Sequence, residues 1–200
     1  MFKEECYQDT DFAGRTLSGE DMEKVRFDGC DFSGADLTDV QMTGCRFEKC
    51  RFSGARFNGA ELRSTAFLTC EFRLASLFGT LFENCKLTGS TFFDTDCTCL
   101  SIQGGDWSYT DMRELEFYRM DLSGLNFEGA ELNGSKFRKC QLKNCRFDHA
   151  WMTNALIEDS DLRGSSLIGI DVLGIHFKNS KVDLQQAVQL AEALGVKYDP

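Results

Sequence analysis

An apolar residue recurs at every fifth position of this 200-residue chain, from Phe2 to Val182, without an insertion or deletion. These register positions hold Phe, Leu, Met, Tyr, Val, Ile or Trp, and in one case Cys97. Sixteen of the 18 Phe lie in this register, and 16 of the 18 Gly lie two residues after a register position. Neither an α-helix, with a period of 3.6, nor a β-strand, with a period of 2, produces a period of five. The pattern therefore predicts a repeat architecture, in which one small unit stacks on the next.

Each repeat has two positions that favour burial. The register residue is large and apolar, and the residue two before it is small, as at Ala35, Ala55, Cys30 and Cys50. Two inward residues in every five fit a chain that turns a corner once per repeat. Four such sides close a square coil of about 20 residues, and successive coils then stack at the β-sheet spacing of ~4.8 Å. The Gly after the register residue suits a corner, because Gly takes φ > 0 without steric cost.

This consensus of small, polar, Phe or Leu, polar and Gly resembles the pentapeptide-repeat family over about residues 10–182. The resemblance implies an all-β solenoid, a right-handed quadrilateral β-helix. The 35 consecutive repeats, at four per coil, predict 8–9 coils. At ~4.8 Å per coil the stack would be ~42 Å long. Because each coil contacts only its neighbours, the ends of such a stack need a cap.

We expect the repeats to occupy residues 1–182, with residues 1–9 as a leader that caps the first coil or forms an incomplete coil of its own. Residues 183–200 change to a helical period, with Asp183 as N-cap and Gly195 as the stop. The apolar stripe of this helix is predicted to cover the end of the last coil. Together with Val196 and Tyr198, it is also predicted to form a two-fold homodimer. The predicted cap and dimer residues are Leu184, Val188, Leu190, Ala191 and Leu194.

Ten Cys could suggest disulfides, but seven of them occupy the small inward position. We expect these to be reduced, buried thiols, with Cys30, Cys50 and Cys70 in one internal ladder because they are 20 residues apart. This use of Cys favours a cytoplasmic location. The sequence predicts neither a membrane span nor a signal peptide. Cys97 and Cys99 have the wrong spacing for zinc and both His lie far from them, so we predict no metal site.

The repeats are less regular from Thr95 to Leu125, where Leu100 and Leu115 occupy the small position. Two interpretations are open. Either two packing arrangements meet in this zone, or the zone is a shaped surface for a partner, with Trp107, Tyr109 and Tyr118.

No pattern of catalytic residues is present in the chain. It lacks a G-x-S-x-G nucleophile turn, a phosphate loop and an H-E-x-x-H zinc motif. We therefore predict no enzymatic activity, no cofactor and no small-molecule substrate.

The net charge of −10 is distributed unevenly. Assigning residues to sides by their number modulo 20 gives −5 on the side centred on Phe12, Phe32 and Phe52, and +1, −2 and 0 on the others, while the termini contribute the remaining −4. B-DNA would carry ~25 negative charges over ~42 Å, whereas this chain carries a net charge of −10. The protein therefore resembles duplex DNA in the sign of its charge, but at a lower charge density. The sign disfavours direct nucleic-acid binding. The acidity serves either solubility alone or a partner-binding acidic side formed by Asp11, Asp31, Glu71, Asp94, Asp111, Glu114, Glu131 and Asp171.

Within the family, the many Phe register residues, the inward Cys and the C-terminal helix look like the Qnr/MfpA group. Residues 171–175, 184–187 and 194–196 are similar to the ends of Qnr-type proteins. The resemblance implies a dimeric rod that binds DNA gyrase or topoisomerase IV, in part by resembling duplex DNA. It also implies relief of inhibition by fluoroquinolones or natural gyrase poisons. Several Qnr proteins carry two projecting loops, whereas the unbroken register here is similar to the loopless mycobacterial or immunity-type members.

Two functions remain open at this point. The first is a DNA-mimicking protein that binds a bacterial type II topoisomerase and protects it from quinolones or natural poisons. The alternative is a non-enzymatic scaffold or regulatory protein that presents one side to another cytosolic protein. Salt-sensitive binding to gyrase and dimerisation through the C-terminal helix would favour the first.

Overall fold

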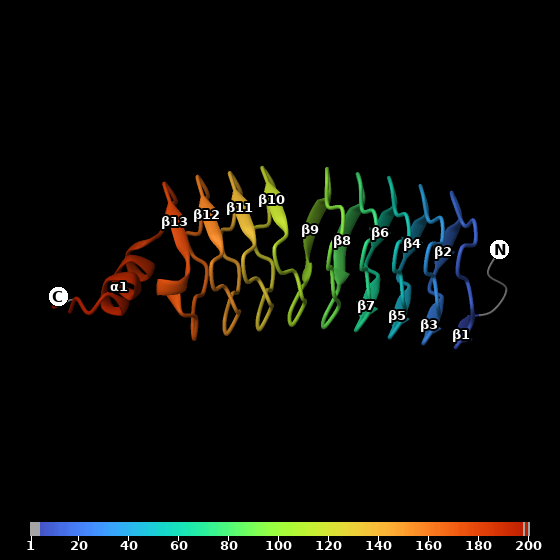
Figure 1. The fold of residues 1–200 in the computed structure, drawn as a ribbon, viewed down its shortest axis with the longest axis horizontal. Helices are drawn as coiled ribbons and strands as arrows, with labels where there is room; N and C mark the ends of the chain where they lie inside the picture. The colour runs from blue at the N-terminus through green and yellow to red at the C-terminus, as the bar shows by residue number, and fades with distance from the viewer. Residues whose placement is uncertain (1–4, 198, 200) are drawn as a thin grey trace. The chain divides into compact units, whose positions relative to one another are not determined.

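The computed structural model describes residues 5–197 and 199, and the chain divides into two compact units, Met1–Asp111 and Met112–Pro200 (Figure 1). Within each unit, every pair of strands and every isolated bridge is parallel and joins residues 20 apart. Four bridged positions per 20 residues, for example Asp11, Thr16, Asp21 and Arg26, define four sides per coil. The predicted fold class, a quadrilateral β-helix of five-residue repeats with a short C-terminal helix, is confirmed.

In the first unit, the paired strands lie on two adjacent sides of the coil. One side carries β1 (Cys6–Gln8), β3 (Arg26–Asp28), β5 (Arg46–Glu48) and β7 (Ala66–Leu68). The side before it in the chain carries β2 (Asp21–Glu23), β4 (Gln41–Thr43) and β6 (Glu61–Arg63). The six-residue strands β8 (Leu81–Lys86) and β9 (Ser101–Asp106) run across both sides.

In the second unit, the strands lie on one side of the coil. They are β10 (Glu116–Tyr118), β11 (Lys136–Arg138), β12 (Leu156–Glu158) and β13 (His176–Lys178). A 3-10 turn, η1 (Val172–Gly174), and the helix α1 (Leu184–Ala193) complete this unit.

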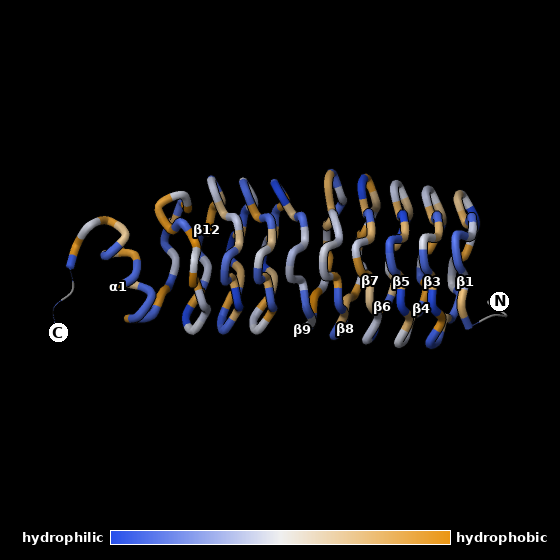
Figure 2. The backbone as a smooth tube through the Cα atoms, turned by 90° about the horizontal axis from the view of Figure 1, so that it is seen from below, coloured by the Kyte–Doolittle hydropathy of each residue, from blue (hydrophilic) through white to orange (hydrophobic). Residues whose placement is uncertain are grey.

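The register residues fill the interior of both units, and apolar and polar residues alternate at short intervals along the tube in Figure 2. Phe12, Phe32, Phe52, Phe72 and Phe92 form one column, with stacked ring centroids 4.8–5.1 Å apart. A second column, Phe27, Phe47 and Phe67, stacks at 4.6 and 4.9 Å and meets the first edge to face. Ring spacing matches coil spacing, so one Phe per side per coil gives continuous aromatic packing.

The corners have the left-handed backbone conformation that the Gly positions predicted. All 19 described non-Gly residues with positive φ also lie two residues after a register position, among them Leu74 at 57° and Asp94 at 53°. The fold imposes this conformation at the corner whatever the side chain is. Asn and Asp tolerate it, but it is unfavourable for a bulky residue.

The irregular zone from Thr95 to Leu125 contains the boundary between the two units. Trp107 is buried there, with its ring centroid 5.5 Å from that of Phe82 and 5.7 Å from that of Phe92. Trp107 therefore contributes to the interior, as the other register residues do, whereas Tyr109 and Tyr118 are exposed. Gly105 occupies the small inward position, where a Cβ would lie 2.2 Å from the Cys85 carbonyl oxygen.

The described part of the leader belongs to the first coil. β1 pairs with β3, and the ring of Tyr7 stacks on Phe27 at 5.4 Å. Phe2 lies outside the described residues, as do Tyr198 and Pro200. None of the described helices has the length and apolar character that crossing a membrane requires.

Seven inward thiols are buried as expected, and no described Cys is in a disulfide. The Cys30, Cys50 and Cys70 thiols each donate to the backbone carbonyl 23 residues earlier, at 3.5–3.6 Å. Burial raises the pKa of Cys85 and of Cys145 to about 11. Because the thiolate is the reactive form, these positions should be inert in the native protein.

We expect a thiol reagent to label the exposed Cys6 and Cys99 rapidly in the native protein, and the seven buried thiols only after denaturation. The measurement is thiol stoichiometry against time, with and without urea. Rapid reaction of most thiols without denaturant would contradict the buried ladder.

Candidate protein-binding surface

The predicted acidic side exists as a ladder in the first unit. Isolated bridges join Asp11 to Asp31, Asp31 to Arg51, Arg51 to Glu71, Glu71 to Thr91 and Thr91 to Asp111. Since each bridge joins equivalent positions of adjacent coils, these outward side chains form one column along the unit. Asp94 follows Phe92 at the corner of the same side and is exposed. The acidic side of the first unit therefore consists of Asp11, Asp31, Glu71, Asp94 and Asp111, with Arg51 and Arg73 as its only basic residues.

The carboxylates of this side differ in their environments. Hydrogen bonds from Ser33 and the guanidinium of Arg51, whose Nη2 lies 2.8 Å from Oδ2 of Asp31, lower the pKa of Asp31. Glu71 and Asp94, by contrast, make no ion pair with any residue that the structure describes. Their charge is therefore the part of this surface most available to a cationic partner.

The remaining predicted acidic residues, Glu114, Glu131 and Asp171, belong to the second unit. Glu131 lies 3.8 Å from the Nε of Arg113, and its ladder continues to Trp151, which is exposed. Asp171 caps η1, because its side chain accepts the amide of Leu173 at 3.2 Å. The eight predicted residues are thus divided between two units, and Asp11, Asp31 and Asp171 each accept the backbone amide two residues further on.

The helix α1 is held against the last coil by glutamine side chains. Nε2 of Gln186, which is buried, donates to the carbonyl oxygens of Leu162 and Ser165, both at 2.8 Å. One coil earlier, the corresponding carbonyls of Leu142 and Cys145 accept from residues of the following coil. Gln186 therefore replaces the hydrogen bonds that another coil would supply, which satisfies buried carbonyls that would otherwise be unpaired.

A capping box fixes the start of α1. The carboxylate of Asp183 accepts the Gln186 amide at 3.0 Å, and the Gln186 side chain accepts the Asp183 amide at 2.9 Å. The other Asp183 oxygen accepts the amide of Gly164 at 2.8 Å, which links the cap to the coil. The N-cap expected from the sequence is confirmed, but the role of Gln186 was missed. The Asp-x-x-Gln spacing was the available signal.

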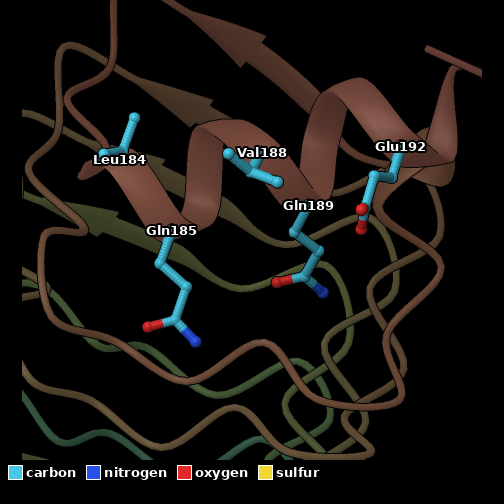
Figure 3. Close-up of a pocket in the computed structure, with 5 residues that line it drawn as sticks. All are labelled: Leu184, Gln185, Val188, Gln189 and Glu192. Carbon is cyan, nitrogen blue, oxygen red and sulfur yellow. The ribbon is translucent and has the colours of Figure 1, made fainter. Parts of the chain in front are cut away.

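The apolar stripe of α1 does not pack on the coil as expected. Leu184 and Leu194 are 74% and 72% exposed, and Gln186 is the only buried residue of the helix. Val188, Leu190 and Ala191 are partly exposed. Figure 3 shows Leu184 and Val188 on an open hollow along α1, together with Gln185, Gln189 and Glu192. The prediction that this stripe covers the last coil is wrong for Leu184 and Leu194, because polar side chains make the contact instead.

The attachment of α1 should depend on pH through Asp183. Amide hydrogen bonds from Gln186 and Gly164 lower its pKa relative to an unfolded chain. A carboxylate whose pKa is lower in the folded state than in the unfolded state stabilises the fold at pH values above its unfolded-state pKa. This stabilisation is lost as the pH falls through its folded-state pKa. We expect hydrogen exchange of the α1 amides to accelerate below about pH 4 in the wild type. Asp183→Ala should show fast exchange already at pH 7, and equal protection of the two proteins at pH 7 would contradict this role.

The described residues contain no group of three or more His, Cys, Asp or Glu side chains that could hold a metal ion.

Comparison with known proteins places the repeats in a family. The description "pentapeptide repeat region" matches residues 20–92, and "pentapeptide repeats", with eight copies, matches residues 108–138 and 140–179. The chain belongs to the pentapeptide-repeat family. Neither description indicates a catalytic family, and none of the curated protein sequences compared with the chain matches it.

Among solved structures, the chain is similar to QnrB1, described as a plasmid-mediated fluoroquinolone resistance protein. A trypsin-treated QnrB1 variant superposes with a TM-score of 0.85 at 27% identity, over 97% of each chain. Full-length QnrB1 gives 0.79 at 25% identity, over 96% of this chain and 100% of its own. HetL, a pentapeptide-repeat protein of the cyanobacterium Nostoc, gives 0.57 at 17% identity, which shows the shared fold alone.

Proposed function

We propose that this protein binds a bacterial type II topoisomerase, DNA gyrase or topoisomerase IV, and protects it from quinolones or natural gyrase poisons. The observation that carries the proposal is the likeness to QnrB1, a fluoroquinolone resistance protein, over 97% of both chains. Non-enzymatic binding agrees with the absence of a catalytic motif from the sequence. Free thiols agree with a cytoplasmic place of action, where such a target would be met.

The acidic side of the first unit supplies a physical basis for binding. Its carboxylates recur along stacked coils in a column that Arg51 and Thr91 interrupt, so the column is negative overall. A surface that binds duplex DNA is strongly positive and would attract such a column. The protein would then occupy the site of a DNA segment, without binding nucleic acid itself. The attraction would weaken with salt, because exposed charges are screened over about 8 Å at physiological ionic strength.

Supercoiling by purified gyrase tests this function. Increasing amounts of the protein are added to gyrase, relaxed plasmid and an inhibitory concentration of ciprofloxacin. The proposal predicts recovery of supercoiling at moderate protein concentrations and inhibition at high ones, when the protein competes with DNA. No recovery, no inhibition and no binding at low salt would leave the scaffold alternative, in which another cytosolic protein is the partner.

We also propose that two copies associate through α1. Leu184 and Val188 lie on the open hollow of the helix, and burial of such residues favours association. The double variant Leu184→Asp with Val188→Asp should convert a dimer into a monomer, measured as mass by light scattering. Gln103→Asp with Gln141→Asp adds the same charge at exposed positions of the coils and should leave the dimer intact. A wild-type protein of monomer mass would contradict the dimer.

A further inference from the structure

Two large apolar side chains project from the acidic side of the first unit. Leu74 is 57% exposed and Phe93 is 49% exposed. They lie in adjacent coils, since the Leu74 amide donates to the Phe93 carbonyl oxygen at 3.0 Å. On the same side, Glu71 precedes Leu74 by three residues, and Asp94 follows Phe93 directly. The pair is therefore an apolar island bordered by two carboxylates that have no ion pair among the described residues.

The fold imposes a left-handed corner at position 74 as at the other corners, but it does not favour Leu there. The backbone of Leu74 has φ 57°, in the left-handed region that favours Gly, Asn or Asp. Its side chain recovers little by burial, because more than half of its surface stays in water. Gly54 occupies the equivalent corner one coil earlier, at φ 67° with nothing within 4 Å of an added Cβ. A residue that is unfavourable for the backbone and exposed to water is better explained by a contact outside the chain.

Phe93 also departs from the repeat pattern, because it is a large apolar residue at an outward position. It is one of two Phe outside the register, and it directly follows the buried Phe92. The guanidinium of Arg73 lies 5.9 Å from its ring centroid, which limits the ring's freedom before any partner binds. An aromatic ring held in place on a surface is the kind of group that contributes most to protein interfaces.

We propose that Leu74 and Phe93 form an apolar anchor that enters a recess in a basic protein surface, while Glu71 and Asp94 pair with cations around that recess. This inference rests on the proposed function and assigns the contact within it. Charge complementarity selects the partner: a nucleic acid would meet like charge, and so would the same side of a second copy. An apolar recess bordered by Lys or Arg would accept the Leu74 and Phe93 side chains and pair with the Glu71 and Asp94 carboxylates.

The test measures the affinity for purified gyrase of three proteins at one salt concentration. They are the wild type, the double variant Leu74→Gly with Phe93→Ser, and the single variant Phe78→Ser. Phe78 is the matched control, because it is the other Phe outside the register, is 48% exposed and lies on the adjacent side. Loss of an interface anchor should weaken binding ~30-fold or more for the double variant. Phe78→Ser should bind within about twofold of wild type, as expected of a residue outside the interface.

A second readout separates anchoring from folding. In Leu74→Gly, the left-handed corner holds a Gly, which adopts this conformation without steric cost. The urea midpoint of this variant should therefore equal or exceed that of the wild type, while its binding to gyrase falls. Unchanged binding of the double variant would overturn the anchor, as would an equal loss with Phe78→Ser. A shift of the double variant from dimer to monomer would assign the island to self-association instead. Failure of wild-type protein to bind gyrase would reject the proposed function, and the anchor with it.

Discussion

Replacing Phe52 by Ala is expected to destabilise the protein by ~3–5 kcal/mol. Phe52 is fully buried, and its ring stacks on Phe32 at 5.0 Å and on Phe72 at 5.1 Å. It also meets Phe47 and Phe67 edge to face, at 5.4 and 5.7 Å. Removing one ring from a stack leaves a cavity that the neighbouring coils cannot fill, because their spacing is fixed by backbone hydrogen bonds. Urea unfolding followed by circular dichroism measures the loss.

Phe78→Ala is the matched control, since Phe78 lies outside the register and is half exposed. This variant should change the free energy of unfolding by about 0.5 kcal/mol or less. Similar losses for the two variants would mean that the interior is not organised by the five-residue register.

Reversing the charge of Glu71 and Asp94 to Lys is expected to weaken binding to gyrase at least ~30-fold at low salt. A pair of exposed charges 4 Å apart interacts by ~1 kcal/mol in water, so the attraction lost at the two sites amounts to ~2 kcal/mol, and the repulsion of the new Lys side chains adds to this loss. The fold should tolerate both changes, because neither carboxylate makes an ion pair within the described residues. Titration of fluorescently labelled protein with gyrase, at several salt concentrations, measures the effect.

Asp21→Lys with Asp39→Lys provides the control for net charge. Both residues are exposed in the first unit, but on other sides of the coil. If binding depends on the acidic side, this control should bind much more tightly than the Glu71 and Asp94 variant. Equal weakening by both pairs would mean that net charge alone governs binding, and an equal loss of stability would mean that the acidic side is structural.

The coil could be predicted from the sequence because its information is local. Within each five-residue repeat, the residue types themselves indicate which positions point inward and where the chain turns. The inward position of Phe52 and the corner at Gly54 can therefore be predicted without knowledge of distant contacts. The ladder of Asp11, Asp31, Glu71 and Asp111 followed from the same arithmetic, since coils of constant length align residues 20 apart.

The end of the stack could not be predicted in this way. The position of α1 depends on the carbonyl oxygens of Leu162 and Ser165, which lack a following coil, and that is a property of the assembled structure. A helical pattern with an apolar stripe suggested a hydrophobic lid, whereas Gln186 and Gln189 supply hydrogen bonds to the coil instead. The helix is therefore oriented by contacts of its polar residues, which the apolar pattern did not predict. Leu184 stays exposed.

Trp107 shows the opposite difficulty. The irregular zone left open whether two packing arrangements meet there or a partner surface is formed, and the interior accommodates the indole beside Phe82 and Phe92. Gly105, two residues earlier, allows the close approach of β8 and β9 that accompanies this packing. The register residue remained inward even where its neighbours changed, so the five-residue period was a better guide than the local irregularity.

The most direct test of the account is a competition between this protein and duplex DNA for purified gyrase. Labelled protein is bound to the enzyme at low salt, and an unlabelled linear duplex is added in increasing amounts. If the protein occupies the DNA site of the enzyme, the duplex displaces it, and Glu71→Lys with Asp94→Lys abolishes most of the initial binding. A stable complex containing enzyme, protein and DNA together, with unchanged affinity for the protein, would contradict this account.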